Sequence, residues 1–179
     1  MKQCGATLLE LIVVLAVSAT LLTIAVPGLS ALFHSSRLAS ATNALIVSLH
    51  VARSEAIKRR QRVILCPSPG GDACAGSGGW HQGWMVFHDA NNNAQRDAGE
   101  SVLLAHPALP GGMRVTSKGS TASYISYTPA GGTQQIGGAF QAGTLTLCHV
   151  SASPDSARQV VIYRTGRPRT AKTSVETCA

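Results

Sequence analysis

Four basic side chains within nine residues near the C-terminus are the residues best suited to hold a ligand. Residues 164–172 read Arg-Thr-Gly-Arg-Pro-Arg-Thr-Ala-Lys. Arg167 and Arg169 are two positions apart, so an extended backbone directs both to the same side. Gly166 permits a turn and Pro168 fixes φ, which predicts a stiff loop after a strand. Guanidinium forks bind phosphate oxygens through paired hydrogen bonds, so the spacing indicates a phosphate ligand such as the DNA backbone.

The charge of the chain is compatible with a polyanionic partner. The formal net charge is +7, and from His34 onward 14 Lys and Arg residues stand against 7 Asp and Glu. Only Tyr163 is aromatic near the arginines, so stacking on single-stranded bases is not the favoured mode. We predict non-specific binding of double-stranded DNA, with affinity that falls steeply with salt. We expect Arg158, Arg164 and Lys172 to extend the patch.

A second basic cluster, Lys58-Arg59-Arg60-x-Arg62, stands at a predicted helix-to-strand junction. Cations in the last turn of a helix interact favourably with its dipole. The cluster is therefore either a charged helix end or a second DNA contact.

An acidic, asparagine-rich segment has the spacing of a calcium loop. Six oxygen-bearing side chains occupy positions 1, 3, 5, 7, 9 and 12 of that pattern, namely Asp89, Asn91, Asn93, Gln95, Asp97 and Glu100. Position 6 is Ala94 rather than glycine, and the flanking residues 84–88 and 101–105 are typical of strands rather than helices. We therefore predict a tight hairpin loop, with calcium binding as the alternative.

Other catalytic and metal-binding patterns are missing from the sequence. It contains no Cys-x-x-Cys or His-x₃-His pair, and neighbouring Cys148 and His149 would point apart on a strand. It also contains no nucleophile elbow and no His-Glu-x-x-His motif. We expect neither an enzyme nor a bound metal or cofactor.

Four cysteines follow the apolar amino-terminal run: Cys66, Cys74, Cys148 and Cys178. An even number in an exported domain indicates two disulfides. Three pairings are possible, and we favour Cys66–Cys74 with Cys148–Cys178 because each closes a loop within one region.

The chain changes from helical to strand patterns at about residue 60. Apolar residues recur at three- and four-residue spacing, which predicts an amphipathic helix to about Arg60: Leu38, Ala41, Leu45, Leu49, Ala52 and Ala56. Short β-rich runs between Gly, Pro and Asn clusters then predict an antiparallel sheet or two small packed sheets, with strands at 63–66, 84–88, 102–105, 124–127, 144–150 and 159–164.

The amino-terminal apolar run is long enough to cross a membrane. Ala6 to Phe33 is 28 residues with one charge, Glu10, about 42 Å as a helix against a hydrocarbon core of about 30 Å. A secretory signal has a shorter apolar core. A carboxylate within hydrocarbon is costly, so Glu10 requires a partner.

The leader Met-Lys-Gln-Cys-Gly, followed by Ala6-Thr-Leu-Leu-Glu10, resembles the class III signal of type IV pilins and pseudopilins. The resemblance implies that a prepilin peptidase cuts between Gly5 and Ala6 and methylates Ala6. It also implies that Glu10 pairs with the amino terminus of a neighbouring subunit. Cys66-Pro-Ser and the tryptophan, asparagine and glycine pattern from Trp80 onward are similar to FimT/GspH-type minor pseudopilins.

This resemblance implies an α+β, pilin-like fold in which a long N-terminal helix packs on an antiparallel sheet domain. It divides the chain into a leader (1–5), a transmembrane and assembly helix (6–33) and a soluble domain (34–179). The protein would cross the inner membrane once, with a periplasmic C-terminal domain, and join major and minor pilins in a pilus.

Gly166-Arg167-x-Arg169 matches the Gly-Arg-x-Arg motif of the FimT branch, which implies DNA binding during uptake for natural transformation. The alternative is a minor pseudopilin that primes or tips a type IV pilus or a type II secretion pseudopilus without binding DNA.

Overall fold

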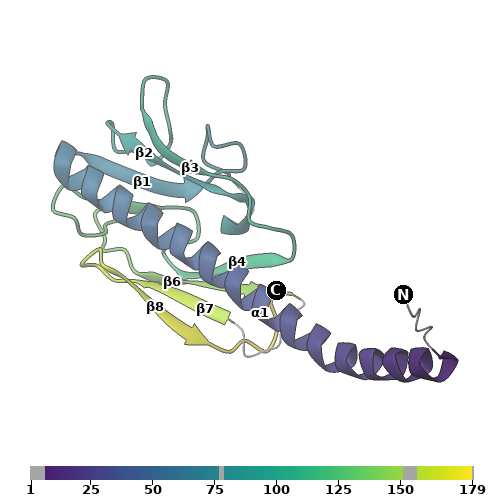
Figure 1. The fold of residues 1–179 in the computed structure, drawn as a ribbon. Helices are drawn as coiled ribbons and strands as arrows, with labels where there is room; N and C mark the ends of the chain where they lie inside the picture. The colour runs from purple at the N-terminus through teal and green to yellow at the C-terminus, as the bar shows by residue number, and fades with distance from the viewer. Residues whose placement is uncertain (1–6, 77–78, 151–156, 179) are drawn as a thin grey trace. The chain divides into compact units, whose positions relative to one another are not determined.

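The computed structural model describes residues 7–76, 79–150 and 157–178 (Figure 1). Two compact units divide between Ser36 and Arg37. The helix α1 runs from Leu8 to Arg59 and is followed by eight strands and the short 3-10 helix η1 (Trp80–Gln82). The strands are β1 (Arg62–Pro67), β2 (Trp84–Asp89), β3 (Val102–His106), β4 (Met113–Gly119), β5 (Ile125–Tyr127), β6 (Gly143–His149), β7 (Ala157–Ile162) and β8 (Pro168–Thr173).

The first unit contains the apolar beginning of α1. Thr7 caps the helix, because its hydroxyl accepts a hydrogen bond from the backbone N–H of Glu10 at 3.2 Å. Glu10 lies in the first turn. By length and composition this helix could cross a membrane. The predicted cleavage site between Gly5 and Ala6 lies outside the described residues.

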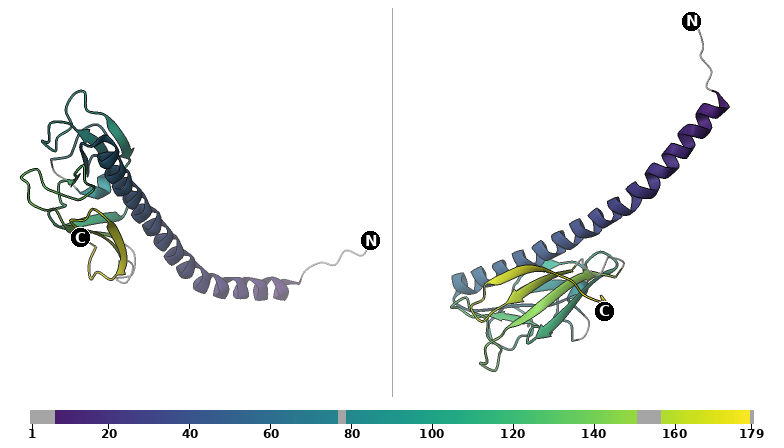
Figure 2. Two further views of the ribbon diagram at one scale, coloured as in Figure 1. Left: turned by 90° about the vertical axis from the view of Figure 1, so that its left-hand side faces the viewer. Right: turned by 90° about the horizontal axis from the view of Figure 1, so that it is seen from below.

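The second unit contains two four-stranded antiparallel sheets. The order of strands is β3-β2-β1-β5 in the first sheet and β4-β6-β7-β8 in the second. From Arg37 onward, α1 lies along one side of the strands, as the right-hand view of Figure 2 shows. This is the α+β arrangement predicted from the sequence, with two small sheets rather than one.

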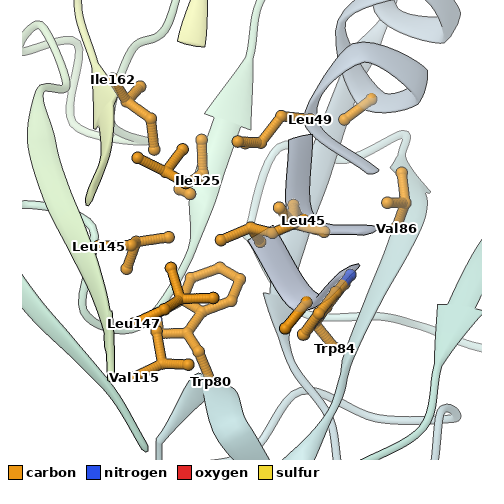
Figure 3. Packing of buried hydrophobic residues seen from close by; sticks show 14 of the residues in the cluster. Leu45, Leu49, Trp80, Trp84, Val86, Val115, Ile125, Leu145, Leu147 and Ile162 are labelled. Carbon is orange, nitrogen blue, oxygen red and sulfur yellow. The ribbon is translucent and has the colours of Figure 1, made fainter. Parts of the chain in front are cut away.

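The core lies between the second part of α1 and the two sheets. All six residues of the predicted apolar stripe are at most 5% exposed: Leu38, Ala41, Leu45, Leu49, Ala52 and Ala56. Leu45 and Leu49 lie between Val86 of the first sheet and Leu145 of the second (Figure 3). The ring N–H of buried Trp84 donates to the Ser48 hydroxyl at 2.8 Å, so this polar helix residue is also satisfied.

Six strands lie where the sequence predicts them, within a few residues at each end. Two strands were not predicted. β4 is bounded by glycines and has only two buried apolar residues, Met113 and Val115. β8 begins at Pro168 and contains Arg169 and Lys172, so the predicted stiff loop at 164–172 is wrong over its second half. Proline fits there because it is the first residue of an edge strand.

Both favoured disulfides are present. Cys66 at the end of β1 is bonded to Cys74, and Cys148 in β6 is bonded to Cys178 beyond β8. The first closes a short loop beside the buried cluster of Ile64, Met85 and Phe87. The second ties the C-terminal segment to the end of β6, an inner strand of the second sheet.

Candidate nucleic-acid interface

The C-terminal arginines lie on the hairpin formed by β7 and β8. Residues 163–167 connect the two strands, and the backbone N–H of Gly166 donates to the Tyr163 carbonyl at 2.8 Å, which closes the turn. The two strands pair antiparallel from Ala157 opposite Thr173 to Ile162 opposite Pro168. Arg167 therefore ends the turn and Arg169 lies in the edge strand.

Gly166 fixes the turn against the body of the domain. Its φ is +72°, and a Cβ at this position would collide with the Gly131 carbonyl oxygen and lie 3.0 Å from the Tyr127 ring. The backbone N–H of Thr133 donates to the Arg164 carbonyl at 3.0 Å. The glycine of the Gly-Arg-x-Arg motif is thus required by its conformation and by close packing.

A hollow of about 540 Å³ lies beside this turn. Its lining combines three arginines with two aromatic rings: Arg164, Arg167, Arg169, Phe140 and Tyr163, together with Ala142 and Thr165. No acidic side chain is among these lining residues. Within the described parts of the chain, none of the three guanidinium groups has a hydrogen-bond or ion-pair partner. Their donors remain available to an anionic ligand.

Arg158 and Lys172 belong to a different surface. They are directly opposite each other on β7 and β8, so both project to the same face of the sheet. That face also carries Val160, which is buried in the core. Lys172 is three residues from Arg169, an odd separation that puts the two on opposite faces. Arg158 and Lys172 therefore lie on the opposite face from Arg169, and their contribution to DNA binding stays a prediction.

The outer face of the second sheet supplies a cation that sequence reasoning missed. Lys118 of β4 pairs with Thr144, Thr144 with Val161, and Val161 with Arg169, which forms one row across four strands. Directly opposed residues share a face. Lys118 and Arg169 are both exposed and lie at the two ends of this row. The alternation of polar and apolar residues in β4 could have indicated that Lys118 is exposed. It could not have indicated that Lys118 lies in the same row as Arg169.

Three of the four residues in the second basic cluster, Lys58, Arg59 and Arg62, make internal interactions. Glu55 accepts a hydrogen bond from Arg59 at 2.6 Å and lies 3.4 Å from Lys58. The Arg59 hydrogen bond, opposed by burial, holds the pKa of Glu55 below its usual value. Arg62 donates to the Ser126 hydroxyl and the Gln134 carbonyl. These contacts favour the interpretation of a charged helix end.

The calcium-like segment is a hairpin loop between β2 and β3. Buried Asp89 accepts hydrogen bonds from the backbone N–H groups of Asn93 and Ala94, both at 3.1 Å. Glu100 accepts two more from loop backbone at 2.8 and 3.0 Å. The described residues contain no group of three His, Cys, Asp or Glu side chains that could hold a metal ion. The acidic residues therefore have a structural explanation as acceptors within the loop.

The long helix, the antiparallel sheets and the apolar beginning of α1 define a pilin-like subunit. The crystal structure of the type IV minor pilin FimU from Pseudomonas aeruginosa PAO1 is similar, with a TM-score of 0.57 at 19% identity over 80% of this chain and 96% of FimU. The minor pseudopilin EpsH from the type 2 secretion system of Vibrio cholerae has a TM-score of 0.53 at 12% identity, over 76% and 97% of the two chains. These likenesses describe the fold.

Comparison with models of sequence families then shows to which family the chain belongs. The family model of type II transport protein GspH matches residues 41–166, and that of the prokaryotic N-terminal methylation motif matches residues 1–26. This chain belongs to the GspH family and is a minor pilin or pseudopilin of a type IV pilus or a type II secretion system. A search of curated protein sequences gave no match. Arg167 and Arg169 lie just beyond the GspH match.

Proposed function

We propose that this minor pilin binds DNA without sequence preference through Arg167 and Arg169, with Arg164 beside them, and serves DNA uptake in natural transformation. The observation that supports the proposal is the arrangement of three unpartnered guanidinium groups around one hollow. A turn fixed by Gly166 positions the backbone that carries them. The guanidinium fork is itself rigid, so little freedom is lost for each hydrogen bond that it makes to phosphate.

The distribution of charge supports the same ligand. Residues 101–175 contain seven basic side chains and one acidic side chain, Asp155. A surface of one sign attracts a polyanion from a distance and speeds its association. Phosphate contacts carry no sequence information, so binding through them is non-specific. Duplex DNA offers such phosphates on both strands.

We also propose that the subunit reaches its pilus from the inner membrane, with the domain from residue 34 onward in the periplasm. Prepilin peptidase would cleave between Gly5 and Ala6, and Glu10 would pair with a neighbouring pilin. Charge compensation permits such a buried carboxylate. Intact-mass analysis of membrane-extracted protein should give a chain that begins at Ala6 with one added methyl group. A start beyond Pro27 would instead indicate an ordinary secretory signal.

The DNA proposal is tested with the full-length chain in nanodiscs of neutral lipid. A labelled duplex is titrated at low salt against the wild type and an Arg167→Ala/Arg169→Ala variant. The matched control is Arg158→Ala/Lys172→Ala, which removes the same charge from the other face of the same hairpin. Because charge-assisted hydrogen bonds contribute about 1.5–3 kcal/mol each, the loss of two such contacts amounts to about 3–6 kcal/mol, and the first variant should bind at least roughly 100-fold more weakly. The control should stay close to the wild type.

The alternative is a pseudopilin that contacts only other pilins. Its support is that the GspH match ends at residue 166, before the two arginines. Equal binding by the wild type and the Arg167→Ala/Arg169→Ala variant, or no binding by either, would favour this alternative.

A further inference from the structure

We propose that the hollow beside the arginines accepts an unpaired nucleobase, so that the site binds single-stranded DNA more tightly than blunt duplex. This inference rests on the proposed function and names the form of DNA that the site prefers. It also differs from the duplex preference predicted from the sequence, where only one aromatic residue was visible near the arginines.

Two exposed aromatic rings line the hollow. Phe140 is 68% exposed and Tyr163 is 49% exposed, and they come from segments 23 positions apart in the chain. An aromatic ring in water normally gains by burial. Exposed aromatic rings beside cations, with no acidic side chain among them, are typical of sites that bind single-stranded nucleic acid. The rings stack on the flat faces of the bases, and the cations contact the phosphates. The hollow, about 540 Å³, is within the range of small-ligand sites.

Phe140 is held by the residue that follows it. Gln141 is fully buried, and its amide donates to the carbonyls of Ser120 and Tyr124, both at 2.8 Å. Its side-chain oxygen accepts from the Ser126 backbone N–H at 2.8 Å. Three hydrogen bonds in the interior therefore fix the backbone beside an exposed ring. A ring carried on a fixed backbone loses less entropy when a base stacks on it than a ring on a mobile loop.

A second hollow adjoins the first one. It measures about 440 Å³ and shares Phe140, Arg164 and Thr165 with the first. Gln134 and Thr128 add an amide and a hydroxyl to its lining. Successive nucleotides could thus occupy the two hollows, with the Arg164 guanidinium near the phosphate between them. A flexible single strand can follow such a path, whereas intact duplex must first unpair and flip a base.

The test compares three labelled DNA probes bound to the full-length chain in neutral nanodiscs. They are an oligothymidylate of about 20 nucleotides, an abasic oligomer of the same length and charge, and a blunt duplex. The variants are Phe140→Ser, which removes the ring, and Phe140→Tyr, which retains it. Val150→Ser is the matched control, because it removes an exposed apolar side chain that lines neither hollow.

We expect the wild type to bind oligothymidylate about tenfold more tightly than the abasic oligomer. Phe140→Ser should lose this ratio and keep its affinity for duplex, while Phe140→Tyr and Val150→Ser should keep both. Equal binding of the thymidylate and abasic probes by the wild type would overturn the inference. So would a ratio that Phe140→Ser leaves unchanged. In both cases the proposed function would still hold if duplex binding depended on Arg167 and Arg169. If duplex binding did not depend on them, both the proposed function and this inference would be overturned.

Discussion

Gly166 links the conformation of one residue to the position of the arginines that follow it. Because its φ is +72° and a Cβ would collide with the Gly131 carbonyl oxygen, Gly166→Ala must strain the turn or move it. We expect a loss of roughly 1–3 kcal/mol in the free energy of unfolding, together with weaker DNA binding. Chemical denaturation measures the first effect. Gly137→Ala is the control, since a Cβ there meets nothing within 4 Å; equal stability of both variants would contradict the packing role.

His81 makes the stability of the domain depend on pH. Burial, with a smaller contribution from Arg114, lowers the pKa of His81 from its ordinary 6.5. In the unfolded chain His81 therefore takes up a proton at a higher pH than in the folded domain, and the stability that is present above pH 6.5 falls as the pH drops below that value. Urea denaturation between pH 7.5 and 5.5 should show this fall, and His81→Gln should reduce it. An equally steep fall in the variant would contradict the assignment.

The elements of this fold differ in how far the sequence reveals them. The stripe from Leu38 to Ala56 is visible because burial on one helix face imposes a spacing of three and four residues. The strand β8 could not be predicted from the sequence, because Pro168, Arg169 and Lys172 do not alternate with apolar residues. Its extended conformation depends on pairing with β7. Local patterns report local burial, whereas pairing between segments is decided by the tertiary fold.

The residues of the candidate site also differ in how far the sequence predicts them. Arg167 and Arg169 were predicted together because they are neighbours in the chain. Phe140 was missed because only the fold brings it beside Tyr163. The sequence did not show that Arg158 and Lys172 lie on the opposite face from Arg169. The face that a residue occupies depends on whether its position in the strand is odd or even, and the limits of β8 were not known.

The hairpin loop between β2 and β3 provides a prediction at the scale of the element. Asp89 is 1% exposed and accepts two backbone hydrogen bonds within the loop. Asp89→Ala leaves these buried donors unsatisfied, so we expect a loss of about 1–3 kcal/mol in stability. A calcium chelator should leave the melting temperature of the wild type unchanged. Melting curves measure both, with exposed Asn91→Ala as the control; a chelator that lowers the melting temperature would instead indicate a bound cation.

At the scale of the whole molecule, residues 101–175 carry a net positive charge, because they contain seven Lys and Arg residues and Asp155 as their one acidic residue. Exposed Arg114 and Lys118 on β4 are on the outer face of the second sheet, the face that also carries Arg169. The GspH domain therefore offers one surface on which a phosphate chain could extend beyond the arginine turn. Under the proposed function, the extent of this surface that contacts DNA determines how strongly salt weakens the complex.

The salt dependence of binding consequently counts the phosphate contacts. Each contact with duplex changes the slope of log K against log salt concentration by about −0.9. Contacts by Arg164, Arg167 and Arg169 alone predict a slope of about −3, and Arg167→Ala/Arg169→Ala should reduce its magnitude by about 2. A wild-type slope near −5 would add Lys118 and Arg114 to the interface, and Lys118→Ala should then lower the magnitude by about 1. Titrations at several salt concentrations measure these slopes. A slope that the double arginine variant leaves unchanged would place the DNA elsewhere on the molecule.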